Sequence, residues 1–301
     1  PHNPLTPRVL VNRIWQHHFG QAIVRTPNNF GFLADPPTHP QLLDWLATEF
    51  LAGGGRMKPL HRLILSSQTW QQSSLHPDAA KIRQRDAENR WRWRAERQRL
   101  DAESLRDSLL AASGELDLAA GGEAFKPTIS EAALEGLSQK SNAWQASPAA
   151  EQNRRSLYMY LKRGLLPPMM TTFDLCDPTR SCGKRDVTIV PTQALALLNN
   201  QFVHDRSETL AASIIAQEAD LERQIRQAWS NVLSRQPTRR ELELSLSHVQ
   251  RQSAVFAADA DDRNGRAGAL EGRAADRETS STEQQQVATQ FALEDDSRFN
   301  R

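Results

Sequence analysis

Apolar side chains recur every three to four residues through most of the sequence, a spacing that places them along one face of an α-helix. These segments are bounded by residues that begin and end helices. Thr6 and Pro7 precede the first apolar stripe and Gly20 follows it, while Thr238 and Glu241 form a capping box before the last. The predicted helices lie at about 7–19, 39–52, 59–70, 101–113, 191–217 and 220–235, and from 238 onward.

This pattern predicts a mainly α, multi-helix domain with long loops and at most one short antiparallel strand pair. The alternation of Arg and Trp over 90–94 suits an extended segment with Trp91 and Trp93 on one side. The apolar run 156–163, which holds both tyrosines of the chain, is the candidate partner strand.

The sequence divides into three parts by composition. Residues 1–256 read as the helical domain, within which 115–153 form a long surface loop. Residues 257–281 have few large apolar side chains and predict a disordered linker, followed by a short terminal helix and tail at 282–301. Because residue 1 is Pro rather than Met, we expect the chain to be a fragment of a longer protein.

Charge and cysteine content exclude several classes of protein. The 37 basic and 36 acidic residues give a net charge of +1, so the whole molecule has no field that would draw it to nucleic acid, which is not a favoured partner. The apolar run 195–198 is far too short to span a membrane. Two cysteines cannot form an all-cysteine zinc site and form no Cys-x-x-Cys-His motif, so we expect no haem attachment in this chain.

Five blocks of sequence, in order, resemble a known family. They lie within 3–17, 37–47, 60–73, 99–107 and 185–200, and they include VNRIWQH, PTHPQLLDWLA, LHRLI, RLDAE, PTQAL and LLNN. Over residues 1–256 the chain resembles the planctomycete surface-domain family of unknown function. The resemblance implies an exported or cell-surface parent protein that carries haem c in a separate, preceding cytochrome-c-like domain, and it implies no particular activity.

The segment from Phe173 to Asp186 is the most site-like stretch of the sequence, since it is dense in Asp, Arg, Cys and Gly and leads into a helix. Its candidate catalytic residues are Asp174, Arg180 and Arg185. If the parent is exported, as the resemblance implies, Cys176 and Cys182 would close this loop as a disulfide. Two alternatives stay open: a nucleophilic cysteine, or unpaired thiols beside a structural Asp–Arg network.

Histidines lie in three of the blocks that carry the resemblance. His17 and His61 are candidate catalytic residues that could join the loop over 173–190. With His18 and His39 they could also form a metal site, but no metal-binding spacing supports one, so we predict none and favour structural roles.

The segment 83–99 is a candidate ligand site because arginine pairs with anionic groups and tryptophan stacks on sugar rings or bases. Its candidate residues are Trp91, Arg92, Trp93 and Arg94. The alternative is that the arginine stems cover buried tryptophans.

Two hypotheses about function follow. The first is a recognition or scaffold module of an exported, haem-bearing multidomain protein, which contacts the other domains of its parent and polysaccharide. The second is a hydrolase or redox-assisted enzyme with its site at the 173–190 loop.

Overall fold

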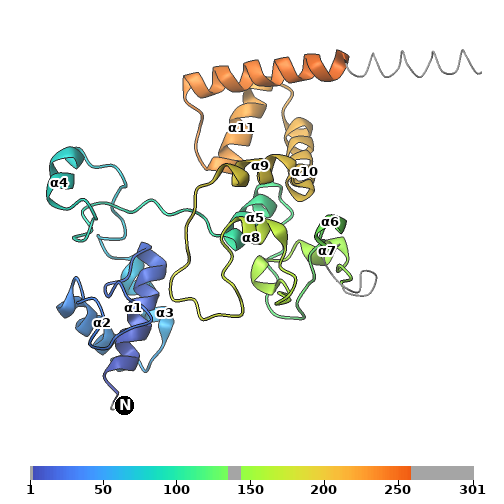
Figure 1. The fold of residues 1–301 in the computed structure, drawn as a ribbon. Helices are drawn as coiled ribbons and strands as arrows, with labels where there is room; N and C mark the ends of the chain where they lie inside the picture. The colour runs from blue at the N-terminus through green and yellow to red at the C-terminus, as the bar shows by residue number, and fades with distance from the viewer. Residues whose placement is uncertain (1–2, 135–143, 259–301) are drawn as a thin grey trace, which may run out of the picture. The chain divides into compact units, whose positions relative to one another are not determined.

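The computed structural model describes residues 3–134 and 144–258 of a chain that divides into two compact units after Ser207. The described residues form helices and loops without a strand, so the predicted mainly α fold is confirmed. None of the helices in this described part is long and apolar enough to cross a membrane. The elements labelled in Figure 1 are α1 (Leu5–Phe19), α2 (Pro40–Ala52), α3 (Met57–Leu65), α4 (Ala79–Arg85), α5 (Ala102–Ala112), α6 (Glu131–Leu134), α7 (Ala149–Gln152), α8 (Pro168–Thr172), α9 (Pro191–Asn199), α10 (Gln201–Gln217) and α11 (Leu221–Leu233).

Helices α1, α2 and α3 enclose the first apolar core. On α1 the side chains of Trp15 and Phe19 stack with ring centroids 4.1 Å apart. Each large side chain buried here contributes roughly 1.5–3 kcal/mol relative to exposure. The buried members of the cluster are Val11, Ile14, Trp15, Phe19, Ile23, Val24, Leu43, Leu46, Phe50, Leu60 and Ile64.

Local hydrogen bonding and backbone geometry define the two ends of α1. The helix begins before the predicted cap Thr6, and the Asn3 side-chain oxygen accepts hydrogen bonds from the backbone N–H groups of Leu5 and Thr6. Gly20 ends the helix as predicted, with a φ of 75°. Asn12, which is fully buried within α1, exchanges two hydrogen bonds of 3.0 and 2.8 Å with the backbone of Val24. These bonds fix the turn that follows Gly20.

The second core surrounds one buried arginine. Arg106 on α5 donates hydrogen bonds to the backbone oxygens of Gln152 and Arg154, and its guanidinium carbon lies 5.0 Å from the ring centroid of Phe125 and 5.1 Å from that of Phe202. Burial lowers the pKa of Arg106 to about 10. The apolar cluster packed beside it consists of Ala102, Phe125, Met159, Met170 and Phe173.

The second unit, from Glu208 onward, is described to residue 258. It holds the end of α10, then α11, and then a helix over 239–258. The predicted capping box of this last helix is confirmed, since Thr238 donates to the Glu241 carboxylate at 2.8 Å and accepts from the Glu241 backbone N–H. The linker predicted at 257–281 and the helix predicted within 282–301 lie outside the described residues, apart from 257 and 258.

The predicted strand at 90–94 is wrong. The Asp86 carboxylate accepts hydrogen bonds from the backbone N–H groups of Arg90 and Trp91, and these donors are therefore not available for pairing with another strand. Asn89 and Arg92 have φ values of 51° and 53°, which turn the chain instead of extending it.

The predicted partner strand at 156–163 is also wrong. Residues 156–158 form one 3₁₀ turn, labelled η1 (Ser156–Tyr158), whose start is held by the Asp107 carboxylate through the Ser156 N–H. Met159 then makes a single isolated parallel bridge to Phe125. In its described parts, 115–134 and 144–153, the segment predicted as a long loop is irregular apart from the short helices α6 and α7.

The single helix predicted over 191–217 is two helices, α9 and α10. Asn200 separates them with an extended φ of −87° and ψ of 122°. Its side-chain oxygen accepts a hydrogen bond of 2.9 Å from the Phe202 N–H, which begins the next helix. Asparagine favours such a capping role over a helix interior, which explains the break.

We predict that Arg106→Ala lowers the free energy of unfolding by about 3 kcal/mol, because it leaves buried backbone oxygens without a donor. Urea denaturation measures this change. Arg155→Ala is the matched control, because Arg155 and Arg106 each lie 3.8 Å from the Asp107 carboxylate but Arg155 is half-exposed. Its loss should lower the free energy of unfolding by less than about 1 kcal/mol. Equal midpoints for the two variants would contradict the central role of Arg106.

Candidate functional site

The loop from Asp174 to Thr188 is closed at its base by hydrogen bonds. The Asp174 carboxylate accepts from the backbone N–H of Thr188 at 2.8 Å and from the Thr188 hydroxyl at 2.9 Å. Gln193, in the first turn of α9 and 2% exposed, donates to the Thr188 hydroxyl and to the backbone oxygen of Thr172. Asp174 is therefore bonded within the loop, where it holds a left-handed backbone with a φ of 60°.

Arg185 ties the same loop to α5. Its two terminal nitrogens lie 2.6 and 2.7 Å from the two carboxylate oxygens of Glu103, in the bidentate geometry that arginine and carboxylate favour. The hydrogen bonds from Glu103, above all, raise the pKa of Arg185. The guanidinium of this candidate catalytic residue is thus engaged with α5.

Arg180 lies at the exposed tip of the loop, where the chain makes a turn whose contacts are among residues 177–180. Its guanidinium is 3.8 Å from the Asp177 carboxylate, and its side chain is 86% exposed. Asp177 in turn accepts hydrogen bonds from the backbone and hydroxyl of Thr179. A hollow of about 570 Å³ beside this tip is lined by polar residues that include Asp174, Arg180, Cys182 and Lys184.

The two cysteines are free and adjacent. Cys182 donates a hydrogen bond to the backbone oxygen of Lys184, and burial together with a hydrogen bond to Cys182 raises the pKa of the Cys176 thiol to about 11. A thiol with this pKa is protonated at neutral pH, which disfavours the alternative of a nucleophilic Cys176. The disulfide between them stays a prediction.

The structure does not bring the two candidate catalytic histidines, His17 and His61, into one site with the 174–188 loop. His17 is exposed on α1, whereas His61 on α3 contacts His18, with His18 Nε2 and His61 Nδ1 2.7 Å apart. Among the described contacts, neither His17 nor His61 bonds to Asp174, Arg180 or Arg185, so no shared catalytic group forms from them. In the described part of the chain, no group of three or more His, Cys, Asp and Glu could hold a metal ion.

The sequence did not single out the pair His18–His61, because i and i+43 positions carry no local signal. Burial, followed by the charges of His61 and His17, lowers the pKa of His18. The rings of His18 and Trp70 also meet edge to face, at 5.3 Å. The pair joins α1 to α3 beside the first core.

The Arg/Trp segment uses most of its polar groups within the chain. Arg92 donates to the backbone oxygens of Phe19 and Gln21, and burial lowers its pKa. Arg94 lies over the Trp93 ring at 5.2 Å and pairs with the Glu96 carboxylate. The Trp93 indole N–H donates to the backbone oxygen of Asp86. Trp91, 68% exposed, is the one of the four candidates with a free ring face, and ligand binding there stays a prediction.

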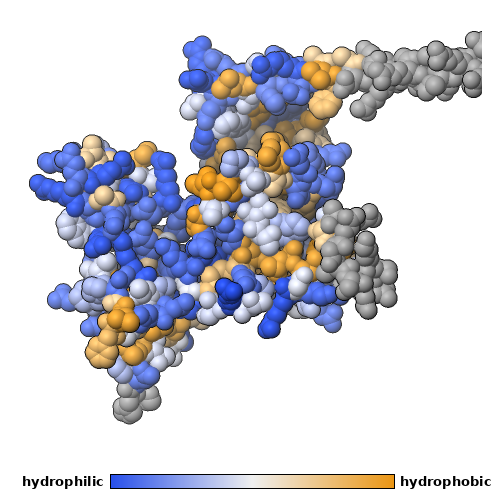
Figure 2. Space-filling view, viewed as in Figure 1, coloured by the Kyte–Doolittle hydropathy of each residue, from blue (hydrophilic) through white to orange (hydrophobic). Residues whose placement is uncertain are grey.

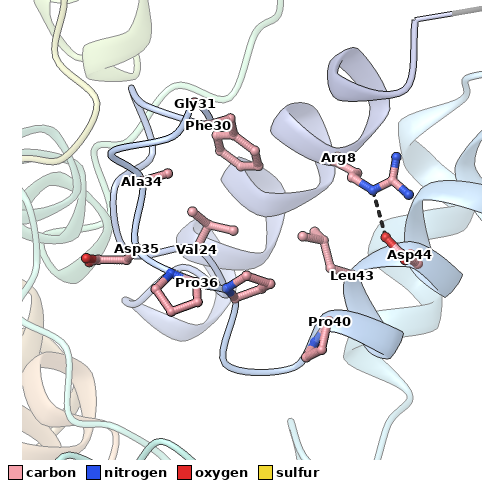
Figure 3. Close-up of a pocket in the computed structure, with 11 residues that line it drawn as sticks. Arg8, Val24, Phe30, Gly31, Ala34, Asp35, Pro36, Pro40, Leu43 and Asp44 are labelled. Carbon is pink, nitrogen blue, oxygen red and sulfur yellow. Dashed lines mark hydrogen bonds and ion pairs between the residues drawn. The ribbon is translucent and has the colours of Figure 1, made fainter.

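A second hollow, of about 400 Å³, lies between α1, α2 and the loop over 26–37 (Figure 3). Val24, Phe30 and Leu43 give it an apolar floor, and the ion pair of Arg8 Nε with Asp44 Oδ1, at 2.7 Å, borders it. The same loop exposes Phe32 and Leu33 almost completely. Figure 2 shows apolar side chains gathered at the lower left, over the part of the chain that holds α1, α2 and α3.

We predict that Asp174→Ala lowers the free energy of unfolding by about 1–2 kcal/mol, since it removes two hydrogen bonds and leaves a left-handed alanine. Thermal unfolding followed by circular dichroism measures the effect. Asp186→Ala, in the same loop and exposed, is the control and should change stability by less than about 0.5 kcal/mol. Unchanged stability in Asp174→Ala would mean that this carboxylate is not structural.

We also predict that the protein loses stability as pH falls below about 6.5, the ordinary pKa of histidine. The pKa of His18 is lowered in the folded state, so its contribution is complete above the unfolded pKa and is lost as pH falls through the folded one. Melting temperatures from pH 8 to pH 5 test this. His61→Gln should flatten the profile, whereas His248→Gln, at an exposed helical position, should leave it unchanged.

A comparison with protein families finds a match over a range that contains all five blocks of sequence. Residues 1–249 match the family described as a protein of unknown function (DUF1553), also called PSD1. No curated protein and no solved structure matches the chain. The family match covers every residue of the 174–188 loop and both hollows, and the chain belongs to the DUF1553 (PSD1) family.

Proposed function

We propose that the chain is a non-catalytic recognition module of an exported multidomain protein of planctomycete type, which carries haem c in another domain, and that the module binds polysaccharide. The bonding of the 174–188 loop is the observation that carries this proposal. A catalytic carboxylate or guanidinium must be free to contact substrate or a proton in transfer. Those of Asp174 and Arg185 are already bonded to Thr188 and Glu103, which favours recognition over a hydrolase or redox-assisted enzyme at this loop.

The apolar surface at the 26–37 loop supports contact with the other domains of the same parent protein. Phe32 and Leu33 are exposed next to a hollow with an apolar floor, and adjoining exposed apolar side chains are typical of protein–protein contact sites. The Arg8–Asp44 ion pair at its border supplies the polar rim that such interfaces carry.

An exported or cell-surface location is part of the proposal, and it gives the cysteines a role. In an oxidising compartment Cys176 and Cys182 would form a disulfide across the exposed tip of the loop. The tip already has its Asp177 turn, so the disulfide would add a covalent constraint to a segment that hydrogen bonds hold at its base.

Affinity electrophoresis through gels with and without polysaccharide tests the proposed function. We expect the chain to migrate more slowly in a polysaccharide gel and the polysaccharide recovered afterwards to keep its chain length. Bovine serum albumin, run beside it, corrects for sieving. Shortened polysaccharide would identify a hydrolase instead, and unchanged migration in every gel would overturn polysaccharide recognition.

A further inference from the structure

A third hollow, of about 510 Å³, opens between the extended segment at 123–126 and the residues around α7. It lies apart in sequence from both the Arg/Trp segment and the 174–188 loop. Its wall is polar, with side chains from Glu123, Lys126, Gln145, Ser147, Glu151 and Arg154.

The alternation of buried and exposed residues explains why one segment faces the hollow. Phe125, Pro127 and Ile129 are buried, whereas Lys126 and Thr128 between them are exposed, as expected for an extended chain with one face on the core. Backbone hydrogen bonds between Phe125 and residues 158 and 160 hold that face inward. The exposed side chains therefore project from a fixed backbone.

Hydrogen bonds of Ser147 and Gln152 hold the opposite wall. Ser147 donates its backbone N–H to the Lys126 oxygen, and its hydroxyl accepts from the Lys126 N–H. The Gln152 side-chain oxygen accepts from Thr128, and its nitrogen donates to the Ser147 oxygen. The polar groups around the hollow are thus positioned by the fold before any ligand arrives, which lowers the cost of binding.

Two aromatic rings lie next to residues that line this hollow. Trp144 and Tyr160 lie with centroids 6.0 Å apart and planes inclined by 37°, and the Trp144 indole N–H donates to the Pro127 oxygen. The Lys126 ammonium, which lines the hollow, is 5.9 Å from the Tyr160 ring centroid. Tyr160 is 44% exposed, so part of its ring is open to solvent.

The charges of the hollow balance. Two carboxylates, of Glu123 and Glu151, face two cations, of Lys126 and Arg154. Within residues 3–134 and 144–258, neither carboxylate takes part in an ion pair, so both keep their acceptor oxygens for a ligand. A polyanion would gain no net attraction from such a surface, because its binding requires an excess of positive charge.

From this geometry we propose that the hollow beside Trp144 and Tyr160 is the binding site for one or two units of a neutral polysaccharide. This inference rests on the proposed function and names its site and ligand class. A sugar ring has an apolar C–H face, which packs on an aromatic ring, and hydroxyl groups, which donate to carboxylates and accept from amide and ammonium groups. The hollow supplies the polar groups, and the Tyr160 ring next to Lys126 supplies the aromatic face.

Affinity electrophoresis of variants tests the site, in gels of hydroxyethylcellulose, xylan, dextran and dextran sulfate. We expect the wild-type chain to be retarded by at least one neutral polysaccharide, and dextran sulfate to retard it no more than dextran does. Tyr160→Ala and Glu151→Ala should each weaken the apparent affinity by about tenfold, as the loss of one stacking or charged hydrogen-bond contact does. Circular dichroism confirms that each variant is folded.

Matched controls separate this site from the rest of the surface. Trp45→Ala removes an exposed aromatic ring of α2, and Glu49→Ala removes an exposed carboxylate of the same helix; both should bind as the wild type does. Wild-type retardation that persists in Tyr160→Ala and Glu151→Ala, or that is lost in Trp45→Ala, would overturn this site while the proposed function stands. Retardation by dextran sulfate alone would overturn the neutral ligand class, and no retardation of the wild type would overturn the proposed function itself.

Discussion

The buried guanidinium of Arg106 joins parts of the first unit that are far apart in the sequence. Its hydrogen bonds reach the backbone at Gln152 and Arg154, and it lies against the rings of Phe125 and Phe202. A buried charge without partners would cost several kcal/mol, so the chain must close around Arg106 with all of these contacts or leave the charge in water. That requirement fixes the described segments on either side of α7, which hold few helical turns of their own.

The short stretch from Arg99 to Asp107 organises more than this core. Arg99 donates to the Thr188 oxygen, Glu103 holds Arg185, and Asp107 accepts from the Ser156 N–H. These charged side chains, spaced four residues apart around the start of α5, thus fix a distant loop and the turn at η1. In the sequence, so many charged residues close together suggest a catalytic site. In the structure, each of these charged groups bonds to another part of the same chain, so their role is structural.

The sequence predicts those helix boundaries that depend on interactions between residues close together in the chain. The end of α1 at Gly20 and the helix start at Thr238 follow from local backbone geometry and hydrogen bonding, and the structure confirms them. Sequence periodicity does not identify Arg106 as buried, because its acceptors lie some fifty residues away. The strand predicted at 90–94 fails for a local reason, since the Asp86 carboxylate accepts from the N–H groups of Arg90 and Trp91. The helix predicted over 191–217 follows an apolar period that continues on both sides of Asn200, and the capping tendency of Asn200 breaks it.

The proposed binding site lies outside the two segments that stand out in the sequence, 83–99 and 173–190. The segments richest in reactive side chains, around Arg92 and Asp174, hydrogen-bond to their own chain and so have few donors left for a ligand. The hollow beside Tyr160 is made from Glu, Gln, Lys and Ser residues contributed by two segments that no motif links. Its chemistry exists only after Ser147 and Gln152 have bonded to the extended segment at 126–128, because that bonding brings the polar side chains to one place. A binding surface assembled in this way is a property of the fold, and residues that the fold does not need for its own bonds are the ones free to recognise a ligand.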